Sequence, residues 1–171
     1  MALTFVFEDK WEAVEHNLER SLKYEKSAET MYRLTQVSLK LKKKSNARKW
    51  SSMAEKKFPD DLYTILAKVD MSLADDKKTQ AMRAIKKAVS AHPQSCDVLM
   101  SFVKVNWMMG YDKPVRSNAQ YVTDLCPDME MAYFYLGMVA HRFYDKKEAK
   151  KQFKRYKKYG GNMLIVPEAY R

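Results

Sequence analysis

The feature that most constrains the fold of this chain is a helix-breaking residue that recurs every 34 positions. Pro59, Pro93 and Pro127 are separated by that step, and the next step falls on Gly161, the second of two glycines. A repeat of this length is typical of proteins built from stacked copies of one small supersecondary unit. We therefore expect an array of such units.

The side chains repeat with the same step. One position of the unit holds a small or β-branched residue, at Ala47, Ala81, Val115 and Ala149. Another position holds a large apolar residue, at Met31, Ile65, Leu99 and Tyr133. Apolar residues spaced by three and four predict helices, and one polar or turn-forming stretch interrupts each unit. Each unit should therefore form two antiparallel helices, which approach closely where the small residues lie.

Composition supports an all-α fold class. The chain of 171 residues has only 4 glycines and 5 prolines, which is too few for a turn-dense β-sandwich or a glycine-rich phosphate loop. Apolar residues make up 46% of the chain and charged residues 31%, so a buried core can form and wholesale disorder is disfavoured.

The last unit resembles the tetratricopeptide repeat, a 34-residue helix-turn-helix with a characteristic pattern of aromatic, Leu-Gly, Ala, aromatic and Pro positions. The matching residues are Tyr133, Leu136, Gly137, Ala149 and Phe153, with Gly161 at the proline position. The resemblance covers about residues 28–161. It implies a right-handed α-solenoid of helix-turn-helix repeats.

The repeat and the flanking residues predict the domain organisation. Residues 1–27 are expected to form an N-terminal capping helix, and residues 162–171 an apolar C-terminal tail. The four repeats between them would span 28–61, 62–95, 96–129 and 130–161. The run from Met163 to Val166 is too apolar for a free tail, so it should pack over the last helix or bind another chain.

The family resemblance also implies where a partner would bind, because the first helix of each repeat lines the concave side. The partner-binding candidates on this side are Tyr32, Arg33, Gln36, Met100, Lys104, Trp107, Met108, Phe134, Tyr135, Met138 and His141. Methionine and aromatic side chains suit a helical or extended protein segment. The alternative for each of them is a place in the core between repeats. The resulting hypothesis is a non-catalytic adaptor or chaperone that binds a segment of another protein.

The charge is strongly positive. Thirty-two Lys and Arg against 21 Asp and Glu give a net charge of +11. One cluster surrounds the first predicted turn, at Lys40, Lys42, Lys43, Lys44, Arg48 and Lys49. The other occupies the last predicted helix, at Lys146, Lys147, Lys150, Lys151, Lys154, Arg155, Lys157 and Lys158. These clusters either form a solvated outer face or bind an acidic protein, a nucleic acid or an anionic lipid surface.

Two alternatives to the adaptor hypothesis therefore remain. The first is a protein that binds nucleic acid or another anionic surface through the outer lysines. The second is a self-associating structural module, in which the apolar tail docks on another copy and a homo-oligomer forms.

No motif for catalysis, cofactor binding or metal binding is found. His16, His92 and His141 lie in different segments, and none is paired with Cys, Asp or Glu at metal-ligand spacing. The sequence lacks a Gly-x-Ser-x-Gly, a phosphate-binding glycine loop and a His-Glu-x-x-His. We therefore expect no enzymatic activity, no cofactor and no metal.

The two cysteines and the N-terminal residues bear on the cellular location. Cys96 and Cys126 lie 30 residues apart without a Cys-x-x-Cys pair, which favours reduced, structural cysteines. The first seven residues lack a basic region and lead into Glu8 and Asp9, which is unlike a signal peptide or a membrane span. A cytoplasmic location is expected.

Overall fold

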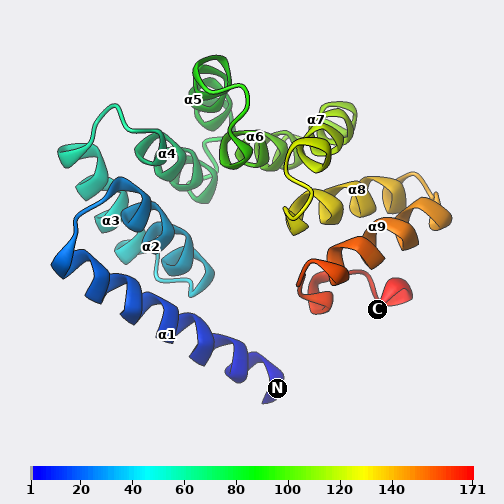
Figure 1. Ribbon diagram of the computed structural model, residues 1–171, viewed down its shortest axis with the longest axis horizontal. Coiled ribbons are helices and arrows are strands. Elements are labelled where there is room, and N and C mark those ends of the chain that lie inside the picture. Colours follow the sequence, from blue (N-terminus) through cyan, green and yellow to red (C-terminus); the bar gives the residue numbers. More distant parts are fainter. Residues whose placement is uncertain (1) are drawn as a thin grey trace. The chain divides into compact units, whose positions relative to one another are not determined.

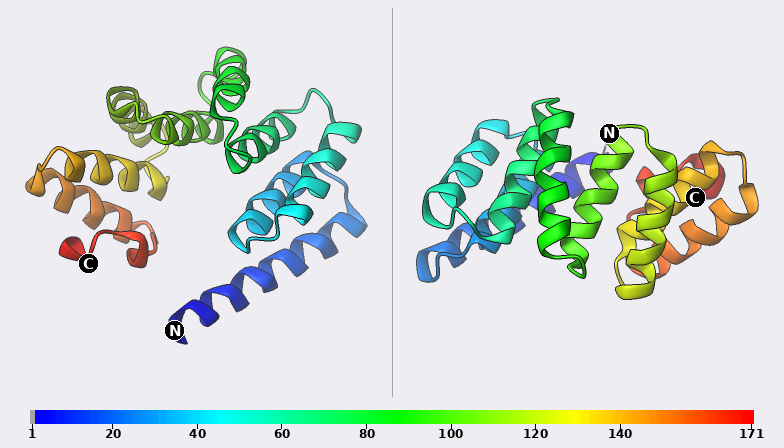
Figure 2. Two further views of the ribbon diagram at one scale, coloured as in Figure 1. Left: turned by 180° about the vertical axis from the view of Figure 1, so that it is seen from behind. Right: turned by 90° about the horizontal axis from the view of Figure 1, so that it is seen from above.

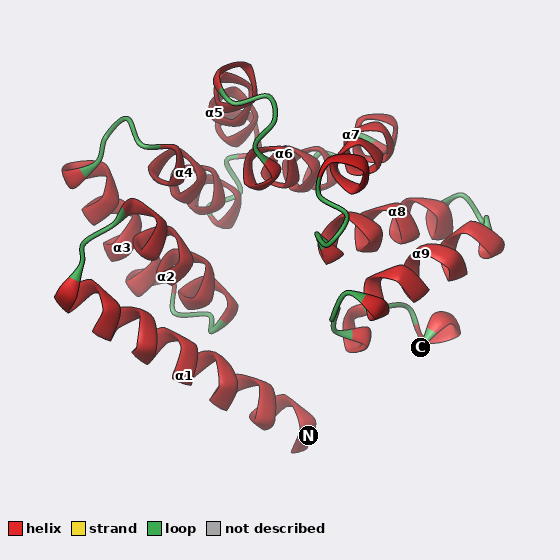
Figure 3. Cartoon of the chain, in the orientation of Figure 1, coloured by secondary structure: helices red, strands yellow, loops and turns green. Residues whose placement is uncertain are grey.

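A computed structural model describes the backbone of residues 2–171 and the side chains from Lys10 onward. This part of the chain contains nine α-helices, two short 3-10 helices and no strand (Figure 3). The α-helices are α1 (Ala2–Tyr24), α2 (Ala28–Lys40), α3 (Lys44–Lys57), α4 (Leu62–Ala74), α5 (Lys78–Ala91), α6 (Cys96–Met108), α7 (Asp112–Leu125), α8 (Glu130–Arg142) and α9 (Lys146–Lys158). The predicted all-α fold class is confirmed.

The chain divides into two compact units, Met1–Ala84 and Ile85–Arg171, here called unit 1 and unit 2. In unit 1, α2 packs against α1, α3 and α4. In unit 2, α6 packs against α7, α7 against α8, and α8 against both α6 and α9. Short turns join α2 to α3, α6 to α7 and α8 to α9, so each of these pairs is antiparallel (Figure 1 and Figure 2).

The turns inside the helix pairs share one backbone conformation. Lys42, Asp76, Gly110 and Tyr144 follow one another at the 34-residue step, and all have a positive φ, between 56° and 78°. After each of them, the next backbone N–H donates to a carbonyl five residues earlier, as from Lys43 to Ser38 at 2.8 Å. This is the Schellman arrangement that ends a helix. Glycine adopts a positive φ without steric cost, yet only one of the four positions is glycine.

The small residues of the repeat lie where the helices of a pair meet. Ala47, Ala81, Val115 and Ala149 are all fully buried. Gly137 in α8 lies against the ring of Phe153 in α9, where a Cβ atom on residue 137 would come within 2.6 Å of the ring. A larger side chain at this position would separate the two helices.

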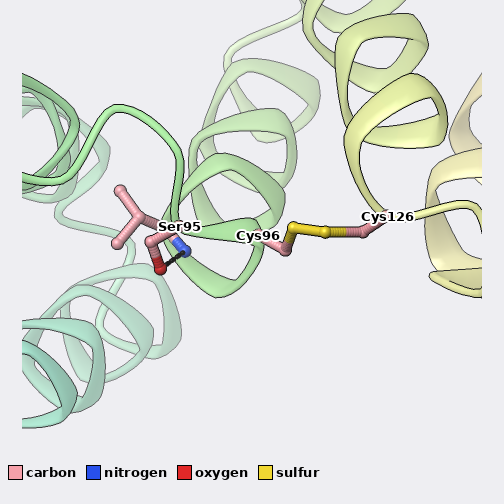
Figure 4. The surroundings of a disulfide bond; sticks show 4 residues. Ser95, Cys96 and Cys126 are labelled. Atoms are coloured by element: carbon pink, nitrogen blue, oxygen red, sulfur yellow. Dashed lines mark hydrogen bonds between the residues drawn. A yellow bond between two sulfur atoms is a disulfide. The ribbon is translucent and has the colours of Figure 1, made fainter.

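The two cysteines form a disulfide in unit 2, so the prediction that they are reduced is wrong (Figure 4). Cys96 is the first residue of α6, and Cys126 directly follows α7. Because the two helices are antiparallel, the end of α7 returns to the start of α6, and the Cα atoms lie 6.5 Å apart. That separation is within the usual range for a disulfide.

The C-terminal tail packs over α9. It contains the 3-10 helices η1 (Met163–Ile165) and η2 (Glu168–Tyr170), and Val166 between them is fully buried. The guanidinium of Arg171 donates to the carbonyls of Leu164 and Val166, each at 2.8 Å, which closes the tail on itself. Of the two placements expected for this segment, the structure shows packing on its own last helix. Docking of the tail on another copy stays a prediction.

Candidate functional site

Helix α6 presents a row of partly exposed side chains, several of them apolar. Met100, Lys104 and Trp107 recur at helical spacing and are half-buried, whereas Met108 at the end of the helix is 43% exposed. The same helix anchors itself in the core of unit 2 through Val103, which is fully buried. Its candidate residues therefore lie at the border between core and surface.

Helix α8 lies beside α6 and continues this surface. Phe134 and Met138 are half-buried, and Tyr135 is 8% exposed. The rings of Trp107 and Tyr135 join the two helices, with centroids 5.8 Å apart. We call the combined half-exposed set of Met100, Lys104, Trp107, Phe134 and Met138 the α6–α8 surface.

Arg142, which is not among the candidates predicted from the sequence, completes this surface. Its guanidinium lies over the indole of Trp107, 4.1 Å from the ring centroid, and forms an ion pair with Asp112 at the start of α7. A cation over an indole face is attracted by the ring quadrupole. The indole is therefore held between Arg142 and Tyr135. No sequence signal marks this contact, because Arg142 lies 35 positions after the tryptophan.

His141 contacts the C-terminal tail instead of joining the α6–α8 surface. Its Nδ1 lies 3.3 Å from the hydroxyl of Tyr170, and the two rings meet edge to face at 5.5 Å. The ring of Tyr170 also packs on Phe153 of α9, with centroids 5.1 Å apart. The side chain remains partly accessible, but one side of the imidazole is already occupied by its own chain.

Two of the three candidates in unit 1, Tyr32 and Gln36, belong to the contact between α2 and α4. Tyr32 is 4% exposed and its ring lies 5.8 Å from the ring of Tyr63. The Gln36 side chain donates to the Tyr32 hydroxyl at 2.7 Å and to a carboxylate oxygen of Asp70 at 3.4 Å. Arg33 lies over the Tyr32 ring at 5.5 Å and forms an ion pair with Glu29 on the same helix, and its side chain is 40% exposed. For Tyr32 and Gln36, the alternative of packing between repeats describes the structure better than an open surface does.

The two lysine clusters differ in their surroundings. In the first, Lys43 pairs with Glu12 and Glu15, and both Lys44 and Arg48 pair with Asp75. Hydrogen bonds and charge from Lys44 and Arg48 lower the pKa of Asp75 to about 2. Much of this cluster is therefore neutralised by the chain itself.

The cluster on α9 stays exposed and carries a single acidic residue. Glu148 lies 3.4 Å from Lys151, the one ion pair found on this helix among the described residues. The buried side of α9 consists of Ala149, Gln152, Phe153 and Tyr156, so all of its lysines face away from the core. A dense positive surface results.

Neither a metal-binding cluster nor a membrane-spanning helix occurs among the residues that the structure describes. No group of three or more His, Cys, Asp or Glu is placed so that it could hold a metal ion. None of the described helices has the length and apolar character needed to cross a membrane.

Neither a protein-family model nor a curated protein matches this sequence. Several solved structures have a similar fold. A thermophilic TPR protein from Thermus thermophilus, TTC0263, has a TM-score of 0.74 at 17% identity, over 98% of this chain and 92% of that one. A tetratricopeptide repeat protein from Parabacteroides merdae has a TM-score of 0.79 at 14% identity, over 97% of this chain and 65% of that one.

A third similar structure is described as YrrB, a TPR protein with an unusual peptide-binding site. Its TM-score is 0.56 at 13% identity, over 93% of this chain and 81% of that one. These similarities confirm the fold that the 34-residue period and the Leu136-Gly137 motif indicated. The chain has the tetratricopeptide-repeat fold.

Proposed function

We propose that this protein is a non-catalytic adaptor or chaperone that binds a segment of another protein on the α6–α8 surface. The observation that carries the proposal is the row of half-exposed methionine and aromatic side chains on two adjacent helices of unit 2. The peptide-binding site named for YrrB lends support by analogy of fold.

The chemistry of the α6–α8 surface suits a segment with apolar anchors. Met100 and Met138 can adapt to the shape of a partner, and Trp107 offers a large aromatic area already held by Arg142. Lys104 adds a positive charge between Met100 and Trp107, one helical turn from each. The preferred occupant is therefore a helical or extended segment with apolar side chains.

The other candidate residues take supporting roles in this proposal. Tyr135 packs against the ring of Trp107, and Met108 extends the surface at the end of α6. His141 would contact a partner only beside Tyr170. Tyr32 and Gln36 hold α2 against α4, and Arg33 pairs with Glu29 on α2. None of the three is assigned a direct contact with the partner.

Alanine substitution tests the proposal. Partners captured from native lysate by the wild-type protein should be lost with Trp107→Ala and with Met138→Ala, since truncating a central anchor typically costs about 2 kcal/mol, or roughly 30-fold in affinity. Tyr121→Ala, an exposed aromatic on α7, is the matched control and should retain the partners. Capture should change little with salt, because apolar burial is not screened. Equal retention by all three variants contradicts the proposal.

Folding must be followed in the same samples. If helicity and melting temperature collapse together with binding, Trp107 and Met138 are core residues and not contacts. Met108→Ala is then the decisive variant, because this side chain is 43% exposed and its removal leaves the core intact.

A second candidate function, binding to nucleic acid or another anionic surface, is favoured by the exposed lysines of α9. Labelled single-stranded RNA is a suitable probe. Its affinity should fall steeply as salt rises, and the double variant Lys150→Glu with Lys154→Glu should abolish binding. Lys56→Glu with Lys57→Glu, two exposed positions on α3, provides a control with the same change of net charge.

The disulfide counts against the expected cytoplasmic location. Structural disulfides persist mainly in oxidising compartments, and Cys96–Cys126 joins two helices of the same repeat. The location therefore stays a prediction, which fractionation of cells followed by thiol labelling would test.

A further inference from the structure

Two turns of unit 2 lie side by side and form one edge of this unit. The first turn joins α6 to α7, and the second joins α8 to α9. Asp112, the first residue of α7, forms an ion pair with Arg142, the last residue of α8. The guanidinium of Arg116 on α7 lies 5.8 Å from the ring centroid of Phe143 in the second turn. Side chains of both turns therefore belong to one continuous surface.

Aromatic side chains protrude from this edge. Tyr111 in the first turn is 48% exposed, and Phe143 and Tyr144 in the second turn are 59% and 89% exposed. All three rings thus have about half or more of their area in water, although they lie on the same edge of unit 2. Apolar area gathered in this way is available to a partner.

Basic side chains surround the three rings. The exposed cations of the edge are Lys113 and Arg116 on α7 and Lys146 and Lys147 at the start of α9. None of these four forms an ion pair with a residue whose side chain the structure describes. We call the exposed side chains of Tyr111, Lys113, Phe143, Tyr144, Lys146 and Lys147 the turn edge.

The acidic residues beside the two turns are already engaged. Asp112 pairs with Arg142, and Asp145 accepts the backbone N–H of Glu148 at 3.0 Å, which caps α9. When Arg142 and Arg116 are counted with the three lysines, five cations stand against two aspartates. The two turns therefore carry an excess of three positive charges next to exposed aromatic rings.

We propose that the turn edge binds the surface of an anionic lipid bilayer. Aromatic rings prefer the headgroup level of a bilayer, and lysine side chains are attracted by the negative potential of anionic lipids. The proposal narrows the second candidate function, on which it rests, to a bilayer and places the contact at one end of α9. It uses no side chain of the α6–α8 surface.

Two other classes of partner fit the turn edge less well. Lysine is depleted at protein–protein interfaces, yet three of the six side chains of the turn edge are lysines. Exposed rings among lysines also suit single-stranded nucleic acid. The Cys96–Cys126 disulfide of the same unit, however, favours an oxidising compartment such as a periplasm or the secretory pathway. In these compartments nucleic acid is scarce, and lipid bilayers supply the anionic surface.

Flotation of the full-length protein with lipid vesicles tests the proposal. Vesicles of equal parts phosphatidylglycerol and phosphatidylcholine should bind the protein. Vesicles of phosphatidylcholine alone should bind it more weakly by about tenfold or more, because each lysine close to an anionic bilayer adds about fivefold to the affinity. No binding to the anionic vesicles, or equal binding to both kinds, overturns the proposal. Binding of single-stranded RNA without binding of anionic vesicles also overturns it, and leaves the second candidate function as nucleic-acid binding.

A pair of aromatic substitutions tests the role of the rings. Phe143→Ser with Tyr144→Ser should weaken binding to the anionic vesicles about tenfold, because the apolar area that enters the headgroup region is lost. The matched control is Tyr121→Ser with Leu125→Ser, two apolar residues near the other end of α7 that are 45% and 38% exposed. The control should bind as the wild type does, and circular dichroism should show unchanged helicity for both variants. Wild-type binding by the Phe143 and Tyr144 variant contradicts the proposal.

Two pairs of lysines locate the bilayer along α9. Lys146→Gln with Lys147→Gln should weaken vesicle binding about 30-fold, at about fivefold for each lysine. Lys157→Gln with Lys158→Gln makes the same change of charge at the other end of the helix, about 16 Å away along its axis. That distance is about twice the screening length of about 8 Å at physiological salt, so this control should bind nearly as the wild type does. Equal weakening by both pairs would lay the bilayer along the whole of α9, which overturns the turn edge as the contact but leaves the second candidate function standing.

Discussion

Replacing Gly137 by alanine tests whether close helix approach holds the repeat together. A Cβ atom at this position would lie 2.6, 2.8 and 2.9 Å from three carbons of the Phe153 ring, whereas carbon atoms prefer about 3.5–4.0 Å. The ring cannot move away freely, because Phe153 is 1% exposed and lies between Phe134 and Tyr170.

Two opposing effects decide the result. Alanine in place of glycine inside a helix stabilises by about 1 kcal/mol, and overpacking a well-filled core costs about 1–3 kcal/mol. Because three ring atoms would be too close to the new Cβ atom, we expect an overpacking cost near the upper end of that range, about 3 kcal/mol. We expect Gly137→Ala to lower the free energy of unfolding by about 2 kcal/mol, and the melting temperature by about 4–8 °C.

Thermal unfolding followed by circular dichroism measures this change, and a double variant shows its cause. In a Phe153→Leu background the ring is absent, so the same alanine should be neutral or stabilise by up to about 1 kcal/mol. A raised melting temperature for Gly137→Ala alone would refute the reasoning, and so would an equal loss in both backgrounds. In either case the glycine would be present for a reason other than helix packing.

Three further predictions concern a turn, the disulfide and a buried carboxylate. Tyr144 is 89% exposed and has a φ of 60°. The left-handed conformation costs a non-glycine residue about 1–2 kcal/mol, whereas glycine adopts it freely but loses about 0.5–1 kcal/mol in chain entropy on folding. Tyr144→Gly should therefore raise the free energy of unfolding, measured by chemical denaturation, by about 0.5–1 kcal/mol. Cys96→Ser should lower the stability of unit 2 by about 2–4 kcal/mol, and a reducing agent should bring the wild type to the same melting temperature; a wild type that does not respond to the reductant contradicts this. Burial acts to raise the pKa of Glu15, but hydrogen bonds from Lys43 and Ser38 outweigh it and hold this pKa below its ordinary value of 4.5. The stability from this contact is therefore present above pH 4.5 and is lost as the pH falls through the lowered pKa. Glu15→Gln should reduce the free energy of unfolding at neutral pH, and the stability of this variant should fall less in acid than that of the wild type. Acid titration followed by circular dichroism measures both effects.

The sequence by itself determined the repeat and the helix pairs, because both follow from local chemistry. Prolines such as Pro93 and Pro127 end helices through their backbone geometry, and small residues such as the buried Ala149 allow two helices to approach closely. Both kinds of residue recur every 34 positions, so the repeat is visible in the sequence. The turns were also visible as polar stretches. Two of their left-handed residues are not, because Lys42 and Tyr144 are residue types that rarely adopt that conformation.

Only the tertiary structure decided which of the repeated apolar residues are exposed and which distant groups meet. Tyr32 and Trp107 are both aromatic residues on the first helix of a pair. Tyr32 is buried against α4, whereas Trp107 stays half-exposed next to Arg142. The Cys96–Cys126 disulfide likewise depends on which helix ends come together. Periodicity specifies the face of a helix on which a side chain lies, but the neighbour that covers this face is set by packing between helices.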